Sequence, residues 1–138
     1  MTVPLIWRKI PHYYNLIGKK CTECNWLYFP PRDVCTKCGS RKLDNHKFNG
    51  IGEIVTYTII RTPMPDPEEE LSDIDTRIVP YILAIIKLVE GPKLTTEIVD
   101  CEPENIAIGK KVELCFRKLL EKGEAGVIQY GYKFRLAR

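Results

Sequence analysis

Histidine and glutamine are scarce in this 138-residue chain, which holds only His12, His46 and Gln129. Neither histidine has an evident serine or cysteine partner, so a nucleophilic triad has no candidate base. The motifs G-x-S-x-G, H-E-x-x-H, the P-loop and G-x-G-x-x-G are missing, and Gly50-Ile51-Gly52 lacks the third glycine of the last motif. The sequence therefore provides no reason to expect an enzyme.

The chain also lacks an apolar run near the roughly 18 residues of a membrane span, and its longest such stretch lies around residues 81–86. Its N-terminus shows no basic start followed by an apolar core, as a secretion signal would. We therefore expect a cytoplasmic protein without a membrane partner. The shortage of glutamine beside plentiful isoleucine, lysine and glutamate is similar to proteins from hot environments.

Charge is distributed unevenly behind a formal net charge of +3. Residues 1–47 carry nine basic and three acidic side chains, residues 48–109 carry four and twelve, and residues 110–138 carry eight and three. The three segments thus have net charges of +6, −8 and +5. A general nucleic-acid binder needs an unbroken basic surface, and the negative middle segment weakens that class of function.

The chain contains six cysteines. Four of them form two Cys-x-x-Cys pairs, Cys21/Cys24 and Cys35/Cys38, which are separated by ten residues. Each pair can form a tight turn that directs two sulfurs at one ion. Four thiolates close a tetrahedral zinc shell at roughly 2.3 Å and leave no position for water or substrate, so the metal would be structural. Asn25 and Gly39 follow the two pairs, and both residue types tolerate the left-handed backbone conformation.

Other interpretations of the cysteines stay open at this point. Iron suits four sulfurs as well as zinc does, and two disulfides are a third possibility that a cytoplasmic setting disfavours. His12 and His46 are surplus to a four-sulfur site. Cys101 and Cys115 lack metal spacing, and we interpret them as buried or half-buried thiols, with a disulfide between them as the alternative.

The rest of the chain predicts one helix followed by a β-rich domain. Trp7, Ile10, Tyr14 and Ile17 recur at helical spacing, with a kink or break at Pro11 and an end at Gly18. β-branched and alternating patterns predict strands at 50–61, 79–89, 94–99, 112–117 and 128–136, with a short helical turn within 102–108. Val112, Leu114 and Phe116 share the predicted apolar face of the fourth strand, which leaves Cys115 on the polar face. Five such strands favour a small closed barrel of the OB type, with a sandwich or an SH3-like barrel as rivals.

Residues 62–78 predict a long acidic loop between the first two strands, because prolines and six acidic residues disfavour a regular element. A solvated loop is the simplest interpretation. Loops of this length also cover grooves or contact partners.

Several stretches together resemble the two-domain zinc-ribbon/OB-fold family associated with acyl-CoA metabolism. The similarity covers nearly the whole chain, although Asn25 stands where the family commonly has glycine. It is carried by PHYYNLIGKKC from Pro11, Phe29-Pro30-Pro31-Arg32, Cys38-Gly39-Ser40, Gly50-Ile51-Gly52-Glu53, Pro80-Tyr81, Glu90-Gly91-Pro92, Gly109-Lys110-Lys111-Val112 and Phe134.

The resemblance implies an N-terminal helical segment at 1–18, a rubredoxin-like zinc ribbon at 19–47 and a five-stranded OB-fold barrel at 48–138. It also implies a non-catalytic subunit of lipid (mevalonate) metabolism. Such a subunit partners a thiolase-type enzyme, either acetyl-CoA acetyltransferase or hydroxymethylglutaryl-CoA synthase, and assists CoA binding or intermediate transfer.

CoA or acyl-CoA needs basic groups for its phosphates and an aromatic or apolar channel for its pantetheine arm. The N-terminal part of the chain offers both, although the aromatic residues can equally pack the helix onto the ribbon and barrel, and Trp7 can face a partner. The candidate CoA contacts are Arg8, Lys9, Tyr13, Tyr14, Lys19, Phe29 and Arg32.

Two other functions compete with this one. A module that binds single-stranded nucleic acid is the alternative, because OB folds and zinc ribbons both serve that role and several tyrosines could stack on bases. A free-standing acyl-CoA enzyme ranks third, because no catalytic constellation is visible.

Overall fold

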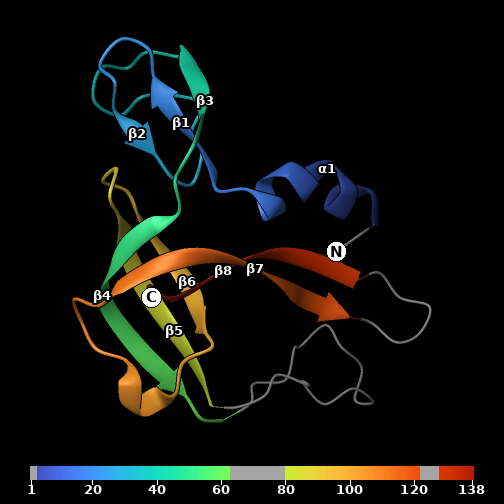
Figure 1. Cartoon of the computed structure of the whole chain (residues 1–138). Helices are drawn as coiled ribbons and strands as arrows, with labels where there is room; N and C mark the ends of the chain where they lie inside the picture. The colour runs from blue at the N-terminus through green and yellow to red at the C-terminus, as the bar shows by residue number, and fades with distance from the viewer. Residues whose placement is uncertain (1–2, 63–79, 122–127) are drawn as a thin grey trace.

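The computed structural model describes residues 3–62, 80–121 and 128–138, and the predicted acidic loop at 62–78 falls almost entirely outside them. One helix precedes a small sheet and a larger barrel (Figure 1). No helix among the described residues is long and apolar enough to cross a membrane. The elements are α1 (Val3–Tyr14), β1 (Ile17–Cys21), β2 (Leu27–Tyr28), β3 (Leu43–Lys47), β4 (Ile51–Ile60), β5 (Tyr81–Leu88), β6 (Lys93–Val99), the 3₁₀ helix η1 (Pro103–Asn105), β7 (Lys111–Glu121) and β8 (Ile128–Leu136).

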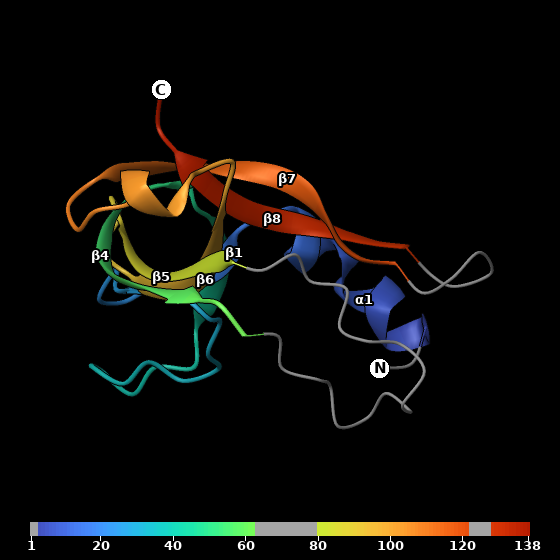
Figure 2. The same cartoon turned by 90° about the horizontal axis from the view of Figure 1, so that it is seen from below.

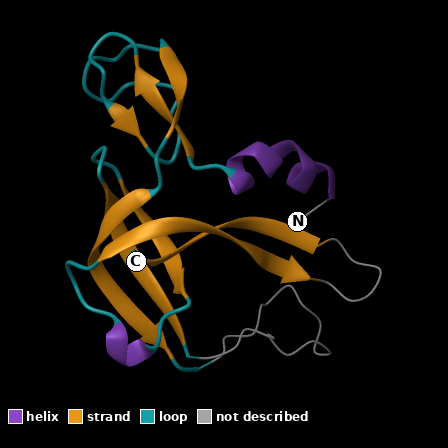
Figure 3. Cartoon of the chain, in the orientation of Figure 1, coloured by secondary structure: helices purple, strands orange, loops and turns teal. Residues whose placement is uncertain are grey.

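Five strands form a closed barrel in the order β4-β5-β6-β8-β7. β4 pairs with both β5 and β7, and the parallel pairing of β6 with β8 completes the circle. A closed five-stranded barrel with a crossed strand order is the OB arrangement. It confirms the predicted fold class and excludes the sandwich (Figure 3).

Alternation along the strands builds the barrel core. In β5, Ile82, Ala84, Ile86 and Leu88 point inward and are buried, while the residues between them are half-buried or exposed. Four of the predicted strands agree with β4, β5, β6 and β8 to within about two residues at each described end, and η1 lies within the predicted 102–108 turn.

β7 departs from the prediction in length and in which residues it buries. It extends to Glu121, well beyond the predicted 112–117, and only its first residues pair with β4. The remainder of β7 has β8 as its paired strand, so this part of the hairpin projects past the barrel (Figure 2). Phe116, predicted to share the buried face of Val112, is therefore 48% exposed, whereas Cys115 is buried.

α1 also ends earlier than predicted. The helix includes Pro11 and stops at Tyr14, while Gly18, the predicted stop, lies within β1. A Cβ at Gly18 would overlap the carbonyl oxygen of Tyr28 and lie 2.6 Å from the Phe48 ring. Gly18 is thus required by close packing inside the small sheet rather than by a helix end.

Leu16 and Phe48 join the small sheet β2-β1-β3 to the barrel. Both side chains are buried in the barrel's core cluster, and the Phe48 amide donates a hydrogen bond to the Leu16 carbonyl at 2.9 Å. Phe29 packs edge-on against Phe48 with ring centroids 6.0 Å apart. This joint anchors the cysteine-bearing segment to the larger core.

Replacing Phe48 by alanine should therefore loosen both parts at once. The side chain is 2% exposed, and deletion of a buried phenylalanine typically costs about 3–5 kcal/mol. We expect a single unfolding transition at much lower denaturant concentration, measured by circular dichroism. Val89→Ala, at an exposed position, is the control and should change stability by less than about 0.5 kcal/mol. If the two variants were equally stable, Phe48 would not stabilise the joint.

Candidate functional site

The two Cys-x-x-Cys turns have nearly the same backbone geometry. The Asn25 amide donates to the Cys21 carbonyl at 3.0 Å, and the Gly39 amide donates to the Cys35 carbonyl at 2.9 Å. Asn25 and Gly39 both have positive φ, 60° and 72°, as their residue types predicted. Amide groups that close each turn therefore aim both sulfurs of a pair toward the other pair.

All four sulfurs converge on one point. The Sγ atoms lie within 4.8 Å of one another, with Cys21 and Cys38 3.5 Å apart and Cys24 and Cys35 3.4 Å apart. Four sulfurs held tetrahedrally at the usual zinc–sulfur distance would be separated by about 3.8 Å, so this spacing fits one ion. Cys21 and Cys35 are buried, whereas Cys24 and Cys38 are exposed.

Tyr28 supports the buried side of the cluster. Its ring is 7% exposed and its hydroxyl lies 3.3 Å from the Cys35 sulfur. The Thr36 amide donates to the same hydroxyl oxygen at 2.9 Å. The Thr36 hydroxyl lies 3.0 Å away and can donate its own hydrogen, which leaves the tyrosine hydrogen for the sulfur. The hydrogen bond from Tyr28, together with backbone amides of Lys37 and Cys38, lowers the pKa of Cys35 to about 6 against the effect of burial, and thus favours the thiolate that a metal requires.

Basic side chains surround the cluster but have partners of their own. Lys19 forms an ion pair with Asp33 at 3.0 Å. The Lys37 ammonium lies 3.3 Å from the centre of the exposed Trp26 ring, and the Arg32 guanidinium lies 5.9 Å from that of Tyr28. Both histidines stay outside the cluster, and His46 packs edge-on against Phe48.

The seven candidate CoA contacts fall into two groups. Arg8, Lys9, Tyr13 and Tyr14 belong to α1, where the two basic residues are exposed. Lys19, Phe29 and Arg32 belong to the cysteine-bearing segment, where Phe29 packs against the barrel core. Tyr13 turns toward the barrel, while Tyr14 meets Phe116 edge-on at 5.1 Å between centroids.

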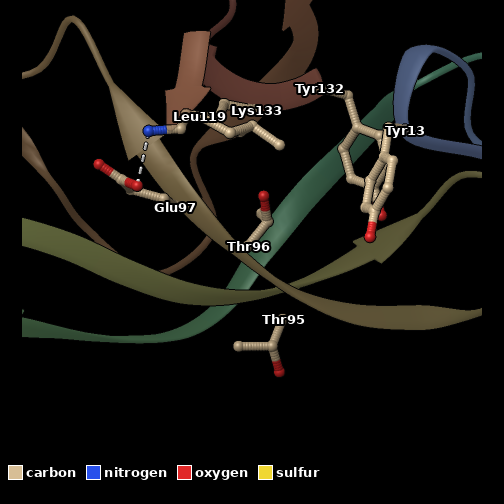
Figure 4. Close-up of a pocket in the computed structure, with 7 residues that line it drawn as sticks. All are labelled: Tyr13, Thr95, Thr96, Glu97, Leu119, Tyr132 and Lys133. Atoms are coloured by element: carbon tan, nitrogen blue, oxygen red, sulfur yellow. Dashed lines mark ion pairs between the residues drawn. The ribbon is translucent and has the colours of Figure 1, made fainter. Parts of the chain in front are cut away.

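A cavity of about 270 Å³ lies where β6 and β8 diverge beneath Tyr13. Tyr13 and Tyr132 form one end, the Lys133–Glu97 ion pair (2.8 Å) forms the other, and the buried Thr96 lies between them (Figure 4). Its lining is completed by Thr95 and Leu119. Of these residues, the sequence predicted only Tyr13 as a CoA contact, because the two strands approach each other through a parallel pairing that alternation does not predict.

Cys101 and Cys115 are both free thiols. Burial raises the pKa of each, so both are protonated at neutral pH. They contribute neither to the sulfur cluster nor to a disulfide.

Tyr28→Phe should weaken the cysteine cluster without altering its sulfurs. The change removes the donor to Cys35 and the acceptor of the Thr36 amide, and an unpaired buried polar group costs about 1–3 kcal/mol. We expect faster loss of bound metal to a chromophoric chelator. Tyr130→Phe, at an exposed tyrosine, serves as the control and should release metal at the wild-type rate. Identical release rates for all three proteins would contradict this role of Tyr28.

Comparison with known proteins finds the same two-part organisation. Residues 14–44 match the rubredoxin-like zinc ribbon domain of ChsH2, and residues 46–117 match its C-terminal OB-fold domain. A DUF35 domain-containing scaffold protein of Methanothermobacter thermautotrophicus is 47% identical over 94% of this chain and 92% of its own length. A probable enoyl-CoA hydratase alpha subunit of Thermomonospora curvata is 32% identical over 78% of this chain but only 31% of its own length.

A solved structure of an Ltp2–ChsH2 (DUF35) aldolase is also similar. It superposes with a TM-score of 0.66 and 30% identity, covering 88% of this chain and 84% of that one. Together, the sulfur cluster, the barrel and these matches define the family. The chain belongs to the DUF35 scaffold proteins, which combine a ChsH2-type zinc ribbon with an OB-fold domain.

Proposed function

We propose that this protein is a non-catalytic scaffold subunit that partners a thiolase-type enzyme, acetyl-CoA acetyltransferase or hydroxymethylglutaryl-CoA synthase, and assists CoA binding or intermediate transfer. The observation that carries the proposal is near-full-length similarity to a scaffold protein of the same family. The similar Ltp2–ChsH2 structure adds support, because there a DUF35 protein is part of an aldolase.

Within this role, Cys21, Cys24, Cys35 and Cys38 would hold one structural zinc ion. The support is the convergence of four sulfurs and the match to a rubredoxin-like zinc ribbon. A fully thiolate shell has no open position for substrate, so the ion would hold the three-stranded sheet together rather than take part in a reaction.

The CoA role is supported by chemistry and by one relative. Arg8 and Lys9 are exposed on α1 and suit phosphate oxygens, while Tyr13 opens onto the cavity between β6 and β8. The Thermomonospora curvata relative is named for an enoyl-CoA enzyme. The ribbon residues Lys19, Phe29 and Arg32 form a second group of proposed CoA contacts.

Cys35→Ser tests the metal assignment. Structural zinc contributes on the order of 10 kcal/mol to such modules, so we expect the variant to lose its zinc and the folded ribbon. Metal content is measured by inductively coupled plasma mass spectrometry and folding by NMR. Cys101→Ser, outside the cluster, should keep one zinc per chain. A Cys35→Ser protein with full zinc and unchanged stability would refute the assignment.

Native purification from the source cells tests the partnership. We expect the tagged full-length protein to recover a thiolase-type enzyme, identified by mass spectrometry, and the recovered complex to bind CoA more tightly than the isolated chain does in calorimetry. Recovery of only nucleic acid and its processing proteins would overturn the proposal and favour a strand-binding OB fold.

A further inference from the structure

Exposed aromatic side chains gather on α1 and on the projecting part of β7 and β8. Trp7 is 64% exposed, and Tyr14, Phe116 and Tyr130 are about 40–50% exposed. A single exposed aromatic residue is ordinary, but a group of them on adjoining elements marks an interaction site. We name this group, Trp7, Tyr14, Phe116 and Tyr130, the aromatic platform.

Three of the four rings of the platform, those of Tyr14, Phe116 and Tyr130, contact one another. Phe116 and Tyr130 stack with planes 10° apart and centroids 5.7 Å apart, and Tyr14 meets Phe116 edge-on. Trp7 precedes Tyr14 by seven residues, which places it about two turns and 10 Å further along the same side of the helix. Rings that are already ordered lose little conformational entropy when a partner covers them.

The contact between α1 and the hairpin is close enough to fix the platform. A Cβ at Gly131 would lie 2.5 Å from a Leu119 methyl carbon and 3.2 Å from the Tyr13 carbonyl oxygen. The Tyr13 carbonyl of α1 therefore lies close to β8 at Gly131, where an added Cβ would be tightly packed. Figures 1 and 2 both show α1 beside the projecting ends of β7 and β8.

Basic residues outnumber acidic ones around the platform, although β7 ends at Glu121 opposite Ile128, and Asp100 pairs with Arg117. Residues 3–14, 116–120 and 128–131 contain no acidic side chain, but include Arg8, Lys9, Arg117 and Lys118. Arg117 is bonded to Asp100, whereas Arg8 and Lys9 are exposed on the helix and have no ion pair among the described residues. A surface that complements this one has an apolar pocket with an acidic rim.

We propose that the aromatic platform is the docking surface for the partner enzyme subunit, with Trp7 as its anchor and carboxylates of that subunit facing Arg8 and Lys9. This inference rests on the proposed function. It adds to that function the face that makes the contact. The α1 residues proposed to bind CoA, among them Arg8 and Lys9, then lie at the edge of that contact.

Two other occupants fit the platform less well. A second copy related by a twofold axis would bring two basic helices together, and like charges at an interface oppose binding. Single-stranded nucleic acid needs free ring faces, but Tyr130 stacks on one face of Phe116 and Tyr14 meets the same ring in a T-shaped contact. Both occupants are outcomes of the test below.

The test uses the full-length chain and the purified acetyl-CoA acetyltransferase and hydroxymethylglutaryl-CoA synthase of the same organism. Dissociation constants are measured by biolayer interferometry at low and high NaCl. The chain offers matched controls, since Trp26 and Lys42 are an exposed tryptophan and an exposed lysine on the ribbon. Zinc content and melting temperature confirm that each variant is folded.

We expect Trp7→Ala to weaken binding about tenfold or more, as truncation of an anchoring tryptophan does. Lys9→Glu should weaken binding at low salt and reduce its salt dependence. Trp26→Ala and Lys42→Glu should bind as the wild type does. If both Trp7→Ala and Lys9→Glu bound the enzyme with the wild-type dissociation constant, the docking surface would be overturned and the proposed function would stand.

Failure of the wild type to bind either enzyme would instead overturn the proposed function, and the docking surface with it. Two further measurements address the other occupants. A dimer of the isolated chain that Trp7→Ala dissociates, seen by light scattering, would assign the platform to a second copy. Binding of an oligothymidylate that Trp7→Ala abolishes would assign it to nucleic acid.

Discussion

Convergence of four sulfurs is the constraint on which the N-terminal half of the structure depends. The ribbon buries only Cys21, Tyr28 and Cys35, with Leu43 packed against them, which is too little apolar surface to hold three short strands. In the function proposed here, a metal–thiolate cluster would replace the missing core, because metal binding in such modules supplies the folding free energy. The hydrogen bond from Tyr28 and the left-handed turns at Asn25 and Gly39 position the sulfurs beforehand.

The ribbon is connected to the barrel by the joint of Leu16 and Phe48. Leu16 and Phe48 flank the ribbon in sequence but are buried in the barrel core, and Gly18 allows the ribbon backbone to approach the Phe48 ring. α1 precedes this joint directly and rests on β8 at Gly131. A scaffold needs such rigidity, because a partner that contacts one element then finds the others in a fixed position. The sulfur cluster, the joint and α1 are thus connected through contacts with the barrel.

Much of this architecture could be predicted from local patterns. Paired cysteines followed by Asn25 and Gly39 favour tight turns around one ion, and a β-branched apolar run in β5 and alternation in β8 identified strands correctly. The position of Phe116 was predicted wrongly, because alternation shows which residues share a face but not where a strand leaves the barrel. The cavity beneath Tyr13 and the platform escaped prediction for the same reason. Both depend on residues from distant strands and on the docking of α1, which no short sequence window contains.

Native mass spectrometry of the full-length chain, purified without added metal or chelator, tests the central claim most directly. The account predicts a folded charge-state distribution with the mass of one zinc ion and four deprotonated cysteines, and conversion to an unfolded ribbon when the ion is removed. A compact metal-free chain whose ribbon stays folded would contradict it. So would a mass that reveals two disulfides among Cys21, Cys24, Cys35 and Cys38.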